Sequence, residues 1–192
     1  MADDRVPVRR VRFEEYEAGI ETLLTQYHGS VAEGFRRWLR RADQAGDGES
    51  APGSEFSPEA YANGELEKDV AYLEANGSRE PVIVALDGET PVGCVYLYRL
   101  SDDDGEVKRL YVREAYRDRG LGRALMGTLI DAAAEAGYST LRLDTAPFMR
   151  SAADLYRDLG FEPYEGGESV SNIPMAILDE ITYMRLSLND RQ

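Results

Sequence analysis

The chain has one cysteine and one histidine among its 192 residues. A single cysteine excludes an internal disulfide, and Cys94 lies in the apolar run V-G-C-V-Y-L-Y, where a small buried side chain is expected. His28 follows a predicted helix in Q-Y-H-G-S, and we interpret it as a surface or capping residue. The sequence has no His/Cys/Asp cluster at ligand spacing and no nucleophile motif, which argues against metal-dependent and Ser-His-Asp chemistry.

Lysine and long apolar runs are also scarce. No apolar run is long enough to cross a membrane, and the N-terminus M-A-D-D-R-V-P-V has no signal-peptide pattern, so we expect a cytoplasmic protein without membrane association. Lys68 and Lys108 are the only lysines, and the net charge of −14 disfavours nucleic acid. Abundant carboxylates with little lysine suggest a salt-rich cytoplasm. Full stability in dilute buffer would contradict that hypothesis.

The N-terminal segments predict a strand followed by helices within one domain, the usual size for a chain of 192 residues. Val8 to Phe13 favours a strand, and Glu14 to Tyr27 has apolar residues at helical spacing. A second helix is predicted over Val31 to Ala42, with an apolar stripe on one side. Its other side carries Arg36, Arg37, Arg40 and Arg41, which is typical of a solvated basic face; binding of an acidic partner is the alternative.

Composition changes abruptly after this predicted helix. Asp43 to Phe56 consists almost wholly of Gly, Ser, Asp, Glu and Pro, which predicts a mobile loop. Ser57 and Pro58 then form a typical helix start, and Gly77 lies near the expected end of that helix. We expect this helix to pack on a sheet.

Short β-rich runs follow. Val82 to Leu86, Val92 to Leu100 and Val107 to Val112 are separated by the turn-forming connectors D-G-E-T-P and S-D-D-D-G. Connectors of this length predict three antiparallel strands joined by hairpins.

The C-terminal part alternates helices and strands. The pattern predicts helices at Gly120 to Ala136 and Arg150 to Leu159, and strands at Thr140 to Asp144 and Ile181 to Leu188. Hairpins followed by alternating elements predict an α+β (mixed α/β) sheet with helices on both faces.

The segment from Arg117 to Arg123 reads R-D-R-G-L-G-R and lies between a predicted strand and a predicted helix. Backbone amides at a helix N-terminus bind phosphate oxygens, and glycines allow close approach. A dinucleotide fingerprint would need a small residue at Leu125, and a P-loop would need Lys and Ser/Thr at Thr128 and Leu129, so both alternatives fail. The window from Val107 to Arg123 holds six basic and two acidic residues, a balance of +4 (6 − 2) that suits an anionic ligand.

The stretch from Glu106 to Leu125, E-V-K-R-L-Y-V-R-E-A-Y-R-D-R-G-L-G-R-A-L, resembles the acetyl-CoA-binding motif of the GNAT acetyltransferase superfamily. Arg117, Gly120 and Gly122 match the R/Q-x-x-G-x-G/A signature, and the resemblance covers roughly Val82 to Pro163. It implies one N-acetyltransferase domain over residues 1–192. The implied fold is a mostly antiparallel, twisted sheet of about six or seven strands that contains a splayed parallel pair.

The resemblance also implies a cofactor site. The backbone of Leu110, Tyr111 and Val112 would contact the pantetheine arm. Family members often have an asparagine where Met149 stands, so Ser151 or a backbone group would have to replace that amide. The pyrophosphate would lie on the turn formed by Arg117, Asp118, Arg119, Gly120, Leu121, Gly122 and Arg123.

Acetyl transfer to an amine needs a base for the ammonium, support for the oxyanion and a proton for the thiolate. Glu106 is the candidate base, because the family's glutamate commonly occupies a similar place; a polar strand end is the alternative. Tyr156 is the candidate acid, matching a family tyrosine; a packed core tyrosine is the alternative. A backbone N–H near Val112 would polarise the thioester carbonyl.

These observations predict an acetyl-CoA-dependent N-acetyltransferase that uses no metal and acts on an amine of a small molecule, peptide or protein. A non-catalytic acyl-CoA sensor and transfer of a longer acyl chain are the alternatives. The acceptor site is expected on the N-terminal helices and on variable loops that include Asp43 to Phe56 and Glu165 to Pro174. The sequence leaves open whether the chain forms a homodimer.

Overall fold

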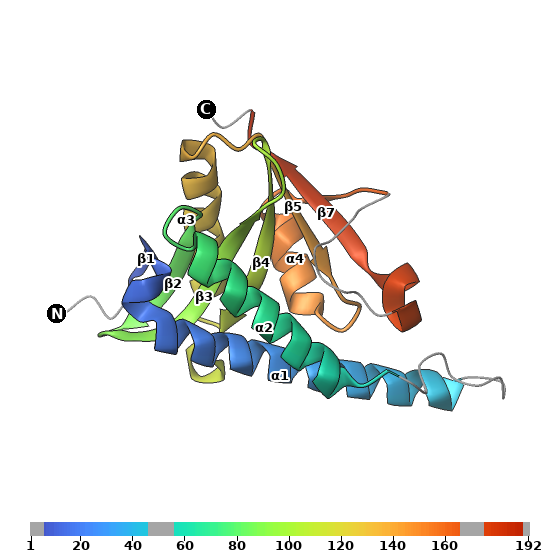
Figure 1. Cartoon of the computed structure of the whole chain (residues 1–192). Coiled ribbons are helices and arrows are strands. Elements are labelled where there is room, and N and C mark those ends of the chain that lie inside the picture. Colours follow the sequence, from blue (N-terminus) through green and yellow to red (C-terminus); the bar gives the residue numbers. More distant parts are fainter. Residues whose placement is uncertain (1–5, 46–55, 166–174, 190–192) are drawn as a thin grey trace.

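The computed structural model describes residues 6–45, 56–165 and 175–189. In this part of the chain, strands form a seven-stranded sheet in the order β1-β2-β3-β4-β5-β7-β6 (Figure 1). Every neighbouring pair is antiparallel except β4 and β5, which are parallel. The strands are β1 (Val8–Val11), β2 (Val82–Asp87), β3 (Thr90–Arg99), β4 (Asp104–Val112), β5 (Thr140–Thr145), β6 (Glu162–Pro163) and β7 (Thr182–Ser187).

Helices cover both faces of this sheet, as the sequence predicts. The side chains of α1 and α2 pack on one face, and those of α3 and α4 pack on the other. Their bounds are α1 (Phe13–Ala45), α2 (Pro58–Asn76), α3 (Leu121–Glu135) and α4 (Arg150–Asp158), with short 3-10 helices η1 (Glu114–Tyr116) and η2 (Met175–Glu180).

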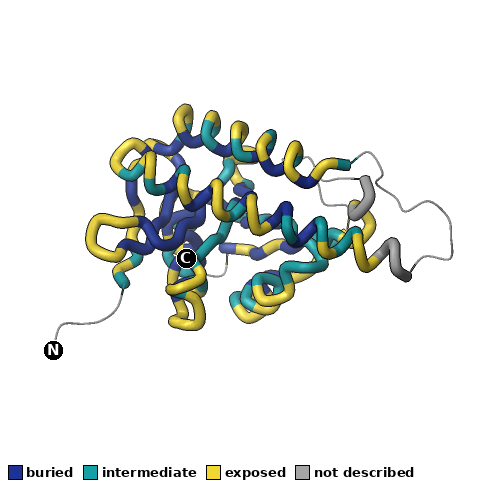
Figure 2. Tube along the Cα trace, turned by 90° about the horizontal axis from the view of Figure 1, so that it is seen from below, coloured by how far each residue is buried: buried dark blue, intermediate teal, exposed yellow. Residues whose placement is uncertain are grey.

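Successive side chains of the inner strands point to opposite faces of the sheet, which produces one hydrophobic core on each face. Ile83 and Ala85 of β2 pack with α3, while Val82 and Val84 pack with α1 and α2. Both faces are apolar, so β2 is buried throughout except at its last residue. Figure 2 shows the same division along the helices, whose buried sides face the sheet and whose exposed sides face solvent. Cys94 lies in this interior with 2% of its surface exposed, which confirms the structural interpretation.

One helix, α1, replaces the two helices predicted over 14–27 and 31–42. The buried stripe of Leu23 and Leu24 continues into Val31 and Phe35 without a change of period. Burial of that stripe outweighs the cost of glycine at position 29, about 1 kcal/mol.

His28 is consequently not a surface residue, because it lies on the inner side of α1 with 3% of its surface exposed.

The segment between the first two helices begins later than expected. The predicted loop over 43–56 lies mostly outside the described residues, and α1 extends through Ala45. The predicted start of α2 is confirmed, since the Ser57 side chain accepts a hydrogen bond from the Ala60 amide. The other variable segment, Glu165 to Pro174, lies outside the described residues beyond its first position.

The parallel pair opens along its length. β4 and β5 pair only at Asp104 with Thr140, Gly105 with Leu141 and Glu106 with Arg142. Both strands then continue, to Val112 and Thr145, without further pairing to each other. The predicted splayed pair is therefore present, and it creates a wedge in the middle of the sheet.

Candidate active site

A β-bulge in β4 borders this wedge. Cys94 pairs with Tyr111 and Tyr96 pairs with Lys108, so two residues of β4 lie opposite one residue of β3. Arg109 lies in the bulge with a φ of 57°, a left-handed conformation that is uncommon for a residue with a side chain. Bulges bend the strand that contains them, which accounts for the divergence of β4 from β5.

Buried ionic contacts hold the bulge in place. The Arg109 guanidinium donates through Nε to Asp69 at 2.8 Å and through its NH2 group to Glu65 at 2.8 Å. Asp69 also lies 2.6 Å from His28 Nε2 and accepts a 2.6 Å hydrogen bond from the Tyr96 hydroxyl. Residues from α1, α2, β3 and β4 thus meet at one carboxylate.

Within this network, the ionised forms of Arg109 and Asp69 are favoured. Burial by itself lowers the pKa of Arg109, but the charge of Asp69 raises it well above its ordinary value. Burial also disfavours the Asp69 carboxylate, yet His28 and Arg109 lower its pKa overall. The network therefore fixes α1 and α2 over the wedge.

The glycine turn predicted to bind phosphate lies just beyond the end of β4. Asp118 and Gly120 both have left-handed backbones, with φ values of 60° and 77°. The first helical hydrogen bond of α3 runs from the Ala124 amide to the Gly120 carbonyl, so the amides between them have no partner within the helix. The turn is exposed, and the sequence prediction that amides are available here agrees with this geometry.

Arginine side chains surround that turn. Arg117 donates to the Val112 carbonyl at 3.0 Å and lies 5.7 Å from the centroid of the Tyr111 ring. Arg119 lies 5.5 Å from the centroid of the Tyr116 ring. Both guanidinium groups remain exposed, so a positive surface lies at the mouth of the wedge.

Three charged side chains lie inside the wedge. Lys108 Nζ is 2.5 Å from Glu106 Oε1 and 3.4 Å from Asp144 Oδ1. Glu106 is 1% exposed and Lys108 is 3% exposed, whereas the Asp144 side chain keeps 20% of its surface exposed. Glu106 is therefore a buried, paired carboxylate, and Asp144 is the more accessible of the two.

Tyr156 of α4 is buried and lies within electrostatic reach of Asp144. Burial raises the pKa of its hydroxyl, and Tyr27 and Asp144 raise that pKa further. A raised pKa keeps the phenol protonated at neutral pH, as a proton donor must be.

Met149 and Ser151 lie at the start of α4. Met149 lines a cavity of about 30 Å³ together with Tyr27, His28 and Asp144, which is room for about one water molecule. Ser151 is exposed on the first turn of α4 and does not line that cavity.

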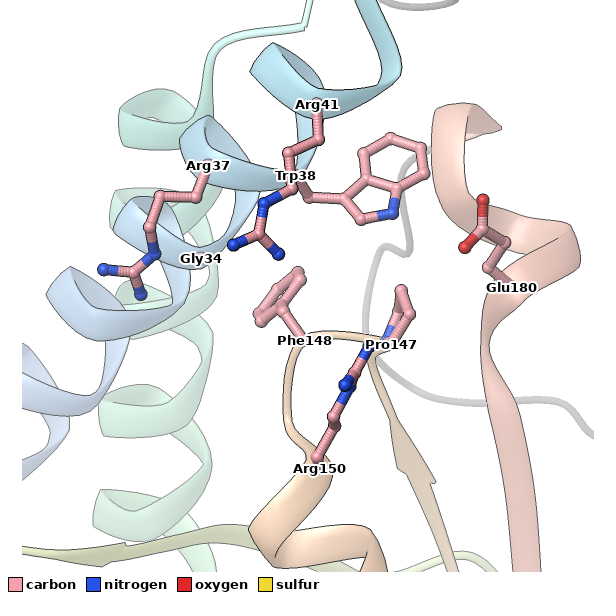
Figure 3. A pocket seen from close by; sticks show the side chains of 8 residues that line it. All are labelled: Gly34, Arg37, Trp38, Arg41, Pro147, Phe148, Arg150 and Glu180. Carbon is pink, nitrogen blue, oxygen red and sulfur yellow. The ribbon is translucent and has the colours of Figure 1, made fainter. Parts of the chain in front are cut away.

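A larger pocket of about 620 Å³ opens beside this small cavity (Figure 3). Its walls come from the C-terminal half of α1, the segment between β5 and α4, and the end of η2. The lining residues are Gly34, Arg37, Trp38, Arg41, Pro147, Phe148, Arg150 and Glu180.

Sequence reasoning missed the side chains that the fold brings in from α1 and α2. Asp144 had a usable signal, since it is a carboxylate near the C-terminal end of a predicted strand. Tyr27, His28, Glu65 and Asp69 had none, because each looks like an ordinary helix residue until the tertiary structure juxtaposes them.

Two further findings concern the described residues only. They contain no group of three or more His, Cys, Asp or Glu side chains placed to hold a metal ion. None of their helices is both long enough and apolar enough to span a bilayer.

Comparisons with known proteins agree with this geometry. An uncharacterized N-acetyltransferase of Schizosaccharomyces pombe is 33% identical over 113 residues, which cover 56% of this chain and 64% of that protein, less than two thirds of its length. The yncA acetyltransferase of Salmonella typhimurium, solved with acetyl-CoA, has a TM-score of 0.60 at 20% identity, with 95% of this chain and 94% of that chain covered. The PaiA N-acetyltransferase of Thermoplasma acidophilum, solved with coenzyme A, has a TM-score of 0.60 at 17% identity, with 94% and 98% covered.

These structures share the fold of the present chain. The family model described as acetyltransferase (GNAT) family matches residues 35–161, which is more than half of the sequence. That range includes α2, the hairpins, the wedge, the glycine turn and α4. The chain therefore belongs to the acetyltransferase (GNAT) family.

Proposed function

We propose that this protein transfers an acetyl group from acetyl-CoA to a primary amine by direct attack of the amine on the thioester. The observation that carries the proposal is the wedge between β4 and β5, which ends at an exposed, positively charged glycine turn. Family membership and the coenzyme A ligands of the two structural neighbours support the same assignment.

The donor would bind along β4. The amides of the turn from Arg117 to Arg123 and the surrounding guanidinium groups suit a pyrophosphate, because both present donors and positive charge. The backbone of Leu110, Tyr111 and Val112 borders the open side of the wedge, where pairing to β5 has ended, and suits the amide groups of the pantetheine arm. We assign the missing asparagine contact to Ser151 or to a nearby backbone group.

The chemical step needs no covalent enzyme intermediate. The amine nitrogen forms a bond to the acetyl carbon, and the carbon–sulfur bond then breaks to release coenzyme A. A backbone N–H near Val112 would stabilise the negative oxygen between these events. Cys94 is 2% exposed and burial raises the pKa of its thiol to about 12, so it is unsuited to carry the acetyl group.

Two carboxylates compete for the role of base. Glu106 is the residue proposed from the sequence, but its Oε1 is already engaged with Lys108. Asp144 lines the small cavity and retains an exposed part, so an ammonium or an intervening water reaches it more easily. We therefore keep Glu106 as the sequence-based candidate and add Asp144 as the candidate with the better access.

Tyr156 remains the proposed acid. Its protonated phenol lies within the electrostatic reach of Asp144, on the α4 side of the wedge. It would give its proton to the thiolate that forms when the carbon–sulfur bond breaks.

The test measures coenzyme A release over a panel of primary amines, from pH 6 to pH 10. Replacing the true base, by Glu106→Gln or Asp144→Asn, should lower kcat about a hundredfold and leave acetyl-CoA binding unchanged. Tyr156→Phe should lower kcat similarly. Glu67→Gln on the exposed side of α2 and Tyr16→Phe near the start of α1 are matched controls that should retain full activity.

Each outcome assigns a role or removes one. If only Asp144→Asn loses activity, Glu106 is a structural partner of Lys108. If both carboxylate variants keep the wild-type pH profile, neither is the base. Tight acetyl-CoA binding by calorimetry without release on any amine would instead indicate an acyl-CoA sensor.

A further inference from the structure

The 620 Å³ pocket beside the wedge has an unusual charge for this protein. Arg37, Arg41 and Arg150 line it, and Glu180 is the one acidic residue among the described residues of its wall, although the chain carries a net charge of −14. In the described part of the chain, Arg41 and Arg150 form no ion pair, and Arg37 lies 3.6 Å from Glu33 at its closest carboxylate contact. Two guanidinium groups without an ion pair to any described residue, in one pocket, are suited to contact an anion.

The side chains converge on a common space. Figure 3 shows Arg41 extending from α1 toward Phe148, and Arg150 extending from the start of α4 toward the neighbouring Pro147. Glu180 faces the same region from η2, on the far side of the Trp38 ring. Among the described residues, the pocket therefore has three arginines, two aromatic rings and one carboxylate around a single opening.

Glycine at position 34 makes the aromatic wall possible. A Cβ added there would lie 2.5 Å from the Phe148 ring, so any larger residue would displace that ring. Phe148 in turn packs edge-on against Phe35, with centroids 5.1 Å apart. Because Phe35 also lines the small cavity next to Asp144, the two hollows share this wall.

The position of the pocket favours the acceptor over the donor. The glycine turn leads into α3, which packs on one face of the sheet. Trp38 and Arg41 belong to α1, which packs on the opposite face. Arg150 begins α4, on the same face as α3, but no residue of the glycine turn over 117–123 lines the pocket, so a ligand held there lies apart from the proposed pyrophosphate site.

We infer that this pocket binds the carboxylate and the apolar body of the acceptor, so that the acceptor class is an amine that carries a carboxylate on an aryl or alkyl skeleton. Arg41 and Arg150 bind the carboxylate, and Trp38 and Phe148 contact the skeleton. The amine then points past Phe148 toward Asp144. This inference rests on the proposed acetyltransferase function and narrows its substrate.

The experiment compares matched acceptors that differ only in charge. The pairs are 4-(aminomethyl)phenylacetate with its primary amide, and 6-aminohexanoate with 6-aminohexanamide. Wild type should prefer the carboxylate by roughly tenfold or more in kcat/KM, as expected for a charge-assisted bidentate contact. The double variant Arg41→Gln, Arg150→Gln should reduce that preference to about twofold or less.

Arg40→Gln is the matched control. Arg40 is the exposed neighbour of Arg41 on α1, lies near Glu33 and does not line the pocket. This variant should retain the wild-type preference, which separates a local contact from a general loss of positive charge. Equal use of acids and amides by wild type, or a preference that survives the double variant, would overturn the inference.

A second arm tests whether the anion is a phosphate of the donor. KM is measured for acetyl-CoA and for acetyl-dephospho-CoA, with wild type and the double variant. We expect the double variant to leave the ratio of these two values unchanged. A rise in KM for acetyl-CoA alone would assign the arginines to the 3′-phosphate and refute the acceptor site.

A binding measurement distinguishes failure of the pocket from failure of the proposed function. Calorimetry with 4-methylphenylacetate and with its amide, in the presence of coenzyme A, needs no turnover. Carboxylate-selective binding that requires Arg41 and Arg150 would support the pocket even if no amine released coenzyme A, and the proposed function would then fail alone. If neither protein binds the carboxylate more tightly than the amide, the inferred carboxylate site is wrong, whether or not the protein releases coenzyme A.

Discussion

Replacing Asp69 with alanine should be the most destabilising polar substitution near the wedge. Its carboxylate contacts His28, Tyr96 and Arg109 at 2.6 to 2.8 Å, and only 4% of the residue is exposed. Truncation of Asp69 removes a partner from each of these three buried side chains, although Arg109 keeps its contact with Glu65. Breaking a buried ionic contact from one side costs about 3 to 5 kcal/mol.

Urea unfolding followed by circular dichroism measures this loss. For a domain of this size the expected change corresponds to a fall of about 10 °C in Tm. Asp102→Ala is the control, because Asp102 pairs with Arg99 while its side chain is 93% exposed. An exposed pair contributes at most about 1 kcal/mol, so the control should remain near wild type.

The pH dependence of the unfolding free energy is a second test, and the pKa of Asp69 fixes the direction of the expected change. The folded-state pKa of Asp69 is lowered, so its stabilising contribution is present above the unfolded-state pKa of about 4 and is lost as the pH falls through the folded value. Below about pH 4, wild type should therefore lose stability more steeply than Asp69→Ala. A loss under 1 kcal/mol at pH 7, or parallel pH curves for the two proteins, would refute the ionic account of this network.

Three further predictions concern single positions. Burial raises the pKa of the Cys94 thiol to about 12. At pH 8 this thiol should therefore react with a disulfide reagent at least about a hundredfold more slowly in the native protein than in the unfolded protein. Equal rates would contradict its burial. Gly120→Ala should cost about 1 kcal/mol in urea unfolding, because φ is 77° although no atom lies within 4 Å of the added Cβ. Gly127 lies within α3, and a Cβ added there would also have no atom within 4 Å. Gly127→Ala should therefore stabilise the protein by about 0.5 to 1 kcal/mol, because alanine favours a helix more than glycine does. A loss of stability in this variant would show that helix propensity does not decide the effect.

Local patterns predicted most of the secondary structure. Hairpin connectors placed β2, β3 and β4, and Ser57 with Pro58 placed the start of α2, because turn and capping chemistry depends on adjacent residues. The break predicted near His28 was wrong, since the continuous buried stripe of α1 outweighs a single glycine.

The sequence by itself determined the proposed donor side of this protein. The glycine turn from Arg117 to Arg123 and the strand before it are contiguous, so their spacing alone specifies amides, positive charge and a helix N-terminus in one place. The splayed β4–β5 pair followed from the family resemblance carried by the same stretch.

Only the tertiary structure decided the proposed acceptor side. The contact of Lys108 with Asp144, the accessibility of Asp144 and the arginine pocket all depend on residues that are far apart in the chain. Arg41 and Arg150, for example, line one pocket because the C-terminal half of α1 lies beside the segment between β5 and α4. Such juxtapositions arise from packing between distant segments. They produce no periodicity or residue spacing in the sequence, so the sequence alone does not predict them.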